Sequence, residues 1–210
     1  MSGKRTPGVR AGLSRAQILD AALAIVDRDG LKALTMRGLG AALGVEAMTL
    51  YYYVPTKDAL IDGLIEQIFV TAAGPVGHSG DWRSRLRAYA ESLRTTVLKH
   101  PGLLPVIARP AVTPATLDAV EEMLRVLTSA GFSLARALDT LNALTVFVIG
   151  HASAEAAIGS PGPPAGLVPE RHPLLVTAVA EGAGSDDQER FRYALSALLA
   201  GLRPDLSAQT

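Results

Sequence analysis

The stretch TMRGLGAALGVEAMTLYYYVPTK, residues 35–57, decides how the rest of the chain is interpreted. It begins with Thr35, whose hydroxyl can accept a hydrogen bond from a backbone amide in the first turn of a helix. Gly44 can adopt the left-handed conformation that ends a helix. We expect a second helix from Glu46 to Tyr53, because Pro55 cannot continue a helix and restricts the residue before it. The stretch therefore predicts two short helices joined by a turn.

Two short helices around a glycine-containing turn are typical of the helix-turn-helix, in which the second helix enters the major groove of DNA. Three consecutive tyrosines, Tyr51 to Tyr53, end this second helix. They follow one another at steps of about 100°, so they cannot all face the same way. Leu50 is expected to face the small core. The alternative that two of the tyrosines belong to the core stays open at this point.

Residues 14–69 resemble the DNA-binding domain of the TetR (tetracycline repressor) family of bacterial transcription regulators. Four linked elements carry the resemblance: Thr35 with Arg37, the Gly44-Val45 turn, the run Thr49 to Tyr51, and Lys57 before an apolar helix. The resemblance implies an all-α fold, with an N-terminal three-helix helix-turn-helix head and a C-terminal helical body for ligand binding and dimerisation.

The resemblance also implies which side chains touch DNA. Thr49, Tyr52 and Tyr53 would face the bases, whereas Tyr51 and Lys57 would hold phosphates. Lys57 opens a helix, where free backbone amides already favour an anion. Arg37 would reach a phosphate or a guanine edge, and two apolar residues at base-contacting positions favour methyl contacts and DNA shape. The expected DNA-contacting residues are Thr35, Arg37, Ala47, Met48, Thr49, Tyr51, Tyr52, Tyr53 and Lys57.

Composition and charge fit this interpretation. The chain has 210 residues, is 49% hydrophobic and contains no cysteine, which rules out disulfides and thiolate chemistry. Its net charge is zero, but residues 1–60 hold eight Lys and Arg against five Asp and Glu, or +3, which leaves −3 for the remainder. A basic head on an acidic body is typical of a DNA-binding module with a separate regulatory part. We expect no membrane span and no secretory signal, and therefore a cytoplasmic bacterial protein.

Helix signals divide the chain into parts. We expect a disordered basic tail over residues 1–13, a DNA-binding domain over 14–70 and a ligand-binding and dimerisation domain over 81–204. Capping residues and breakers set the expected helix ends. The expected N-terminal caps are Ser14 (with Gln17), Thr35, Thr56, Asp81, Thr113, Ser133 and Ser185 (with Gln188).

A second resemblance concerns the body. The segment HPGLLPVIARP, residues 100–110, and the later SAGFSLARAL resemble the ligand-binding domain of the tetracycline-repressor subgroup. That subgroup places a metal-coordinating histidine before the Arg-Pro pair, whereas residues 103–108 here contain no His, Asp or Glu. We therefore expect an apolar effector, no metal and no cofactor. The expected ligand-binding residues are Leu64, Ile68, Leu103, Leu104, Val106, Ile107, Asn142, Phe147 and His151.

The long helix to about Ile158 and the last helix carry more apolar surface than one body can hide. Packed against their copies they would form a four-helix bundle, and a dimer would place two heads on half-sites about 34–36 Å apart. The expected interface residues are Leu138, Leu141, Val148, Phe191, Leu195, Leu198 and Leu202.

The sequence favours a homodimeric repressor that leaves a palindromic double-stranded DNA operator when a small, largely apolar effector binds. Its four histidines are scattered, and we find no HExxH, no GxSxG and no phosphate-binding glycine loop, so we do not expect an enzyme. The alternative is an all-helical small-molecule carrier or enzyme whose head only looks like a DNA binder.

Overall fold

A computed structural model describes residues 13–74, 81–109, 113–158, 166–182 and 186–205. These residues form helices and connecting turns and no strand, which confirms the predicted all-α class. Residues 1–12 of the expected tail, the segment 75–80 and the expected cap Ser185 lie outside the described residues. The helices, in order, are α1 (Arg15–Asp29), η1 (Leu31–Ala33), α2 (Met36–Ala42), α3 (Ala47–Leu50), α4 (Lys57–Ala73), α5 (Trp82–Lys99), η2 (Pro101–Leu103), α6 (Pro114–Ser129), α7 (Leu134–Ile158), α8 (Pro173–Ala180) and α9 (Asp187–Gly201).

Most predicted helix starts are confirmed at the level of single hydrogen bonds. The Ser14 hydroxyl accepts from the Gln17 amide, and the Gln17 side chain accepts from the Ser14 amide, which completes the capping box. Thr35 and Thr56 each accept a backbone amide at 3.0 Å, from Gly38 and Ala59. Asp81 caps α5 and Thr113 caps α6 in the same way. These bonds satisfy amides that have no partner within their own helix.

Two local expectations need correction. The second helix of the helix-turn-helix ends as an α-helix at Leu50, and residues 51–53 form turns. The Leu50 carbonyl accepts from the amides of both Tyr53 and Val54, and Pro55 then bars further helical bonding. The cap of α9 is Asp186, whose carboxylate accepts from the amides of Gln188 and Glu189 at 2.8 and 3.0 Å.

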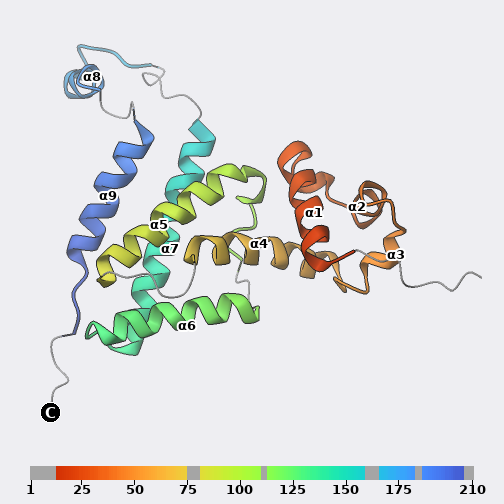
Figure 1. Ribbon diagram of the computed structural model, residues 1–210. Helices are drawn as coiled ribbons and strands as arrows, with labels where there is room; N and C mark the ends of the chain where they lie inside the picture. The colour runs from red at the N-terminus through yellow and green to blue at the C-terminus, as the bar shows by residue number, and fades with distance from the viewer. Residues whose placement is uncertain (1–12, 75–80, 110–112, 159–165, 183–185, 206–210) are drawn as a thin grey trace, which may run out of the picture.

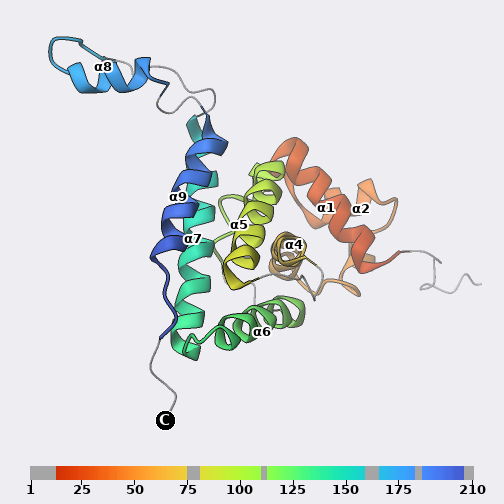
Figure 2. The same ribbon diagram turned by 60° about the vertical axis from the view of Figure 1, so that its left-hand side comes forward.

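Helix α4 connects the two parts of the molecule. It starts beside α3 in the head and continues into the body, where α5 and α6 flank it (Figure 1). Viewed nearly along its axis, α4 lies among α1, α5 and α6 (Figure 2). Its apolar residues are correspondingly buried on more than one side: Leu60, Ile61, Leu64, Ile65 and Ile68. A helix with so wide an apolar surface must be covered from several directions, which explains its central position.

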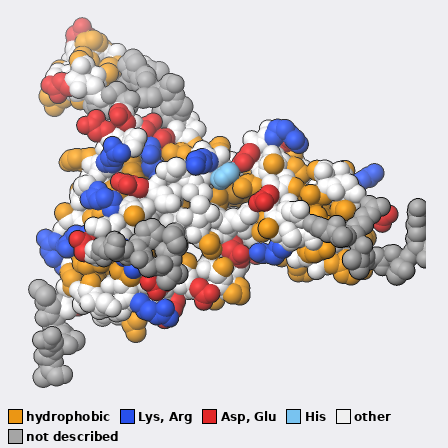
Figure 3. Space-filling model, viewed as in Figure 1, with side chains coloured by type: hydrophobic (Ala, Val, Ile, Leu, Met, Phe, Trp, Pro, Cys, Tyr) orange, Lys and Arg blue, Asp and Glu red, His pale blue; other side chains and the backbone are white. Residues whose placement is uncertain are grey.

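The far side of the body consists of α7 and α9, which run side by side with α5 between them and α4 (Figures 1 and 2). The short helix α8 stands away from the body as an arm. Its Leu174 is 85% exposed, and hydrophobic and acidic side chains appear together on this arm in Figure 3. No helix in the described part of the chain is long and apolar enough to cross a membrane.

Candidate nucleic-acid interface and ligand pocket

Helix α3 presents an exposed aromatic tip. Leu50 and Val54 are buried and hold this segment on the head's core, as expected for Leu50. Tyr52 is 89% exposed, and Tyr51 and Tyr53 are 40% and 38% exposed. None of the three tyrosines is a core residue, so the alternative that two of them are buried does not hold. Three phenol hydroxyls are therefore available at this end of the molecule.

The remaining residues expected to contact DNA lie on α2 and its cap, on α3 and at the start of α4. Arg37 lies exposed in the first turn of α2, and Lys57 lies exposed at the start of α4. Met48 is exposed on α3, whereas Ala47 and Thr49 are half-buried. The Thr35 oxygen accepts the Gly38 amide, so its hydroxyl proton stays available to donate.

Several contacts join the head to the body. The Nδ1 atom of His100, at the end of α5, lies 2.9 Å from a carboxylate oxygen of Asp27 in α1. Gly102 of η2 lies so close to α1 that a Cβ atom there would be 2.7 Å from both the Cγ1 atom and the backbone oxygen of Val26. Arg15 of α1 also pairs with Glu66 of α4 at 3.1 Å. Head and body are therefore in direct contact through α1 as well as through α4.

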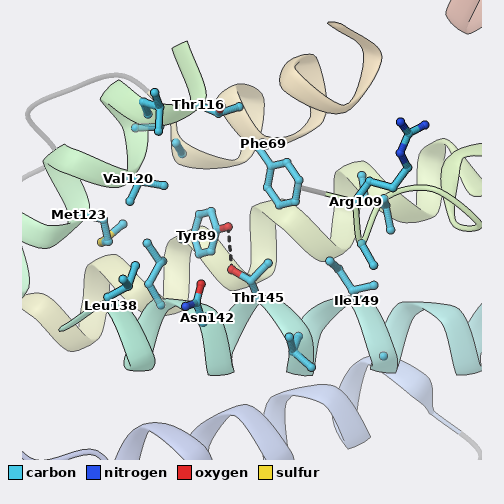
Figure 4. Close-up of a pocket in the computed structure, with 18 residues that line it drawn as sticks. Phe69, Tyr89, Arg109, Thr116, Val120, Met123, Leu138, Asn142, Thr145 and Ile149 are labelled. Carbon is cyan, nitrogen blue, oxygen red and sulfur yellow. Dashed lines mark hydrogen bonds between the residues drawn. The ribbon is translucent and has the colours of Figure 1, made fainter. Parts of the chain in front are cut away.

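A cavity of about 580 Å³ lies in the body between α4, α5, α6 and α7. Figure 4 shows Phe69 of α4, Tyr89 of α5, Met123 of α6 and Asn142 of α7 around it. Its walls are mainly apolar. The complete lining is Phe69, Ala73, Tyr89, Ile107, Ala108, Arg109, Thr116, Leu117, Ala119, Val120, Met123, Leu138, Leu141, Asn142, Thr145, Val146, Ile149 and Gly150.

A few polar groups interrupt this apolar wall. The Tyr89 hydroxyl lies 3.1 Å from the Thr145 hydroxyl, the contact drawn as a dashed line in Figure 4. Burial raises the pKa of Tyr89, because the phenolate would lose its hydration there, so the phenol stays neutral at ordinary pH. The amide of Asn142 adds a donor and an acceptor. The cavity thus offers neutral hydrogen-bonding groups within a largely apolar space.

Only part of the expected ligand set lines this cavity. Ile107 and Asn142 do, whereas Leu64, Ile68 and Leu103 are buried in the core, and Leu104 and Val106 are half-buried beside it. The structure places Phe147 and His151 elsewhere. Phe147 stacks on Phe191 of α9, with ring centroids 5.5 Å apart, and His151 meets the same ring at 5.1 Å.

Helical geometry explains this placement. At about 100° per residue, Phe147 and His151 lie roughly 140° and 180° around α7 from Asn142, so they face away from the cavity that Asn142 lines. Thr145 and Ile149 lie within roughly 60° of Asn142, and both line it. The sequence contains this spacing, so it shows that Asn142 cannot share a face with Phe147 and His151, but it does not show which of the two faces meets the cavity. Phe69 and Tyr89 lie among the apolar residues of α4 and α5, and nothing local in the sequence distinguishes an apolar residue that lines a cavity from one that fills a core.

The expected dimer residues fall into two groups. Leu141, Val148, Phe191 and Leu195 are buried within the single protomer. Leu138, Leu198 and Leu202 keep exposed surface. Phe191 and Leu195 are covered because α9 packs against α5 and against the Phe147 side of α7, whereas Leu141 lines the cavity on another side of α7. Arg94 of α5 adds to this packing, since its guanidinium lies 5.1 Å from the Phe191 ring and binds Glu155 through two nitrogens.

No group of three or more His, Cys, Asp or Glu side chains that could hold a metal ion occurs in the described part of the chain. The two candidate sites are the exposed tip after α3 and the apolar cavity, and α4 extends from beside the first to the wall of the second.

Known proteins share this arrangement. The family described as "Bacterial regulatory proteins, tetR family" matches residues 18–64, and the one described as "Tetracyclin repressor-like, C-terminal domain" matches residues 75–206. The tetracycline repressor protein class D of Escherichia coli is 31% identical over 210 residues, which cover 94% of this chain and 93% of that protein. An HTH-type transcriptional regulator of Saccharopolyspora erythraea is 34% identical over 145 residues; these cover 69% of this chain and only 61% of that longer protein.

A solved structure gives the same result in three dimensions. ActR of Streptomyces coelicolor, in complex with (S)-DNPA, superposes with a TM-score of 0.74 at 27% sequence identity, covering 91% of this chain and 97% of that one. Two family matches that together span most of the chain, and a 31% identical full-length relative, agree with the helix-turn-helix and the helical body. This chain belongs to the TetR family of bacterial transcription regulators.

Proposed function

We propose that the protein is a homodimeric transcriptional repressor that leaves a palindromic operator when a small, largely apolar effector fills the cavity. One observation carries this proposal: α4 begins at Lys57, beside the exposed tyrosine tip, and lines the cavity near its other end through Phe69 and Ala73. A ligand in the cavity therefore touches the same helix that positions the DNA-reading head. Such a protein acts where the operator is, in the bacterial cytoplasm.

Operator binding would use the head's exposed residues. Tyr52 is the most exposed tyrosine and extends from the end of α3, so it is the best placed to reach a base or the adjacent backbone. Arg37 and Lys57 would neutralise phosphates on either side of the recognition helix. Thr49 and Met48 would contribute methyl contacts in the groove. Ala47 and Thr49 are half-buried, so they would reach the bases only if the backbone of α3 lies deep in the major groove.

The dimer would form through the outer faces of α7 and α9, on the side of the body away from the head (Figures 1 and 2). Apolar and small residues remain exposed there, among them Leu134 on α7 and Tyr193 and Ala197 on α9. With the first group of predicted residues buried inside the protomer, Leu138, Leu198 and Leu202 are the members of the predicted set that a partner could still cover.

The effector would occupy the cavity between α4, α5, α6 and α7. Its volume of about 580 Å³ lies in the range of small-molecule sites. Relatives bind small molecules: the ActR structure contains (S)-DNPA, and the class D protein is named as a tetracycline repressor. Residues 103–108 hold no His, Asp or Glu, so this segment offers no ligand of the kind that would hold a metal with the effector. Release requires that the ligand bind the DNA-free arrangement more tightly, and about 1–3 kcal/mol of coupling is typical.

Gel-shift titration of DNA from upstream of the protein's own gene tests the proposal. A good base contact discriminates by roughly 1–3 kcal/mol, so Tyr52→Ala should weaken specific binding about tenfold or more and random DNA far less. The control is Arg125→Ala, which truncates an exposed side chain (67%) on α6, outside both the head and the proposed dimer face. If Tyr52→Ala weakens both DNAs equally, Tyr52 does not read sequence. If the wild type retards no upstream DNA above random DNA, the protein is a helical carrier and not a repressor.

A further inference from the structure

The cavity has a marked charge asymmetry. Among its described lining residues Arg109 is the single charged side chain, and no Asp or Glu lines the wall. Arg109 lies two residues after Ile107 in the segment between η2 and α6, at the edge of the cavity. Figure 4 shows its guanidinium turned away from Tyr89 and Asn142, toward the outside of the site. If Arg109 turned from Asp58 toward the cavity, a ligand lying there would have a permanent positive charge at one end and neutral groups elsewhere.

The present partner of Arg109 is weakly held. A guanidinium nitrogen lies 3.5 Å from a carboxylate oxygen of Asp58, and the two side chains are 43% and 76% exposed. An ion pair this exposed is screened by water and holds its partners loosely. A carboxylate on a ligand could replace Asp58 with a two-pronged contact, because the planar guanidinium presents parallel N–H donors that match a carboxylate.

The rest of the cavity suits an apolar, aromatic body. Phe69, Met123 and Ile149 supply ring, thioether and aliphatic surface, all favourable next to an aromatic ring. Asn142, Thr116 and the hydroxyl pair of Tyr89 and Thr145 can bond to polar substituents on such a ring. These groups are neutral, so they neither attract nor repel an anion strongly.

We propose that the effector is an aromatic acid, with a fused-ring body in the cavity and an anionic group bound by Arg109 in exchange for Asp58. This inference rests on the proposed function, because it names the chemical class of the effector. It also gives the ligand's charge a role in release. Asp58 lies in the first turn of α4, next to Lys57. Once Arg109 has left it, an unpaired carboxylate stands beside the expected phosphate contact and weakens the hold on DNA.

Matched pairs of ligands test this class. Fluorescence titration of the full-length protein would compare 2-naphthoic acid and anthracene-2-carboxylic acid with their primary amides, which have nearly the same shape and no charge. We expect each acid to bind about tenfold more tightly than its amide, since a hydrogen bond to a charged group contributes on the order of that factor. Arg109→Gln should bring the ratio to about one, because it weakens acid binding about tenfold relative to amide binding. Asp58→Asn should tighten acid binding, because it removes the competing carboxylate.

The control is Arg125→Gln, which removes the same charge from α6 at a residue that pairs with Glu121 and Glu122 outside the cavity. It should leave the acid-to-amide ratio at the wild-type value. A ratio near one in the wild type, or an unchanged ratio in Arg109→Gln, would overturn the proposal while leaving the cavity as the effector site. If no probe binds, the aromatic-acid proposal is overturned. If the probes bind and Val120→Trp and Ile149→Trp leave this binding intact, they do not bind in the cavity, and the proposed mode of release is contradicted as well.

Discussion

His151 illustrates how a residue's surroundings, and not its type, decide its role. Its ring lies against Phe147 and Phe191, and its Nδ1 atom is buried without a hydrogen-bond partner. Burial lowers the pKa of His151, the nearby Glu155 carboxylate opposes this, and the cations Arg94 and Arg190 lower the pKa further. The protein therefore holds this imidazole neutral more strongly than water does, which fits a packing residue better than a ligand for an anion.

The lowered pKa makes a prediction about stability and pH. The unfolded chain binds a proton at His151 more readily than the folded chain, so the stabilisation is complete above the ordinary value of 6.5 and is lost as pH falls through the lower folded value. We expect the wild-type melting temperature to fall between pH 8 and pH 5, and His151→Phe to fall less over the same range. Thermal melts at several pH values measure the difference. Parallel pH profiles for the two proteins would mean that His151 is as easily protonated in the folded state as in the unfolded one.

At the scale of elements, the contact of η2 with α1 fixes how the head sits on the body. Gly102 is required there, because a methyl group would come within 2.7 Å of Val26, including its backbone oxygen. We predict that Gly102→Ala destabilises the protein by about 1–3 kcal/mol, as overpacking usually does, measured by urea unfolding. The control is Gly150→Ala in α7, where an added Cβ meets nothing within 4 Å. There the change should stabilise by about 0.5–1 kcal/mol, since alanine favours a helix. Equal effects at the two glycines would show that the joint tolerates the added methyl.

Elements also show what the sequence can and cannot predict. The caps Ser14, Thr35 and Thr56 were predictable because each depends on a residue three positions along the chain. The apolar stripe of α4 was predictable because helical periodicity is local. The rotation of α7 about its own axis was not, because it depends on α5 and α9 packing on one side of it. This is why Phe147 and His151 were expected in the cavity, while Thr145 and Ile149 line it.

At the scale of the whole molecule, the position of the cavity and the charge at its edge could not be predicted from the sequence either. Arg109 and Asp58 are 51 residues apart in the sequence. The fold brings the segment 101–109 close to the first turn of α4, where a guanidinium nitrogen of Arg109 lies 3.5 Å from a carboxylate oxygen of Asp58. The candidate recognition surface, in contrast, lies within one short stretch, and the resemblance of residues 35–57 to a known family was enough to expect tyrosines that point outward. Local sites are readable from a single sequence, whereas sites built by several helices need the tertiary structure.

The last prediction concerns the proposed dimer. One face of α9 packs in the protomer's own core, and the other would contact the partner protomer. Phe191, Leu195 and Leu199 face the protomer's own core, whereas Ala197, about 200° around the helix from Leu195, is exposed. A glutamate buried in either place without a partner costs several kcal/mol, but the consequence differs. Leu195→Glu should unfold the protomer, with loss of helical circular dichroism. Ala197→Glu should keep the helical signal and yield monomers by light scattering. Those monomers should bind the full operator far more weakly, since a single head reaches only one half-site.

Leu198→Glu, at a half-buried residue between these faces, should impair both folding and dimerisation. If Ala197→Glu remains a folded dimer with full operator affinity, α9 is not at the interface, and the exposed face of α7 or the α8 arm must hold the two copies together.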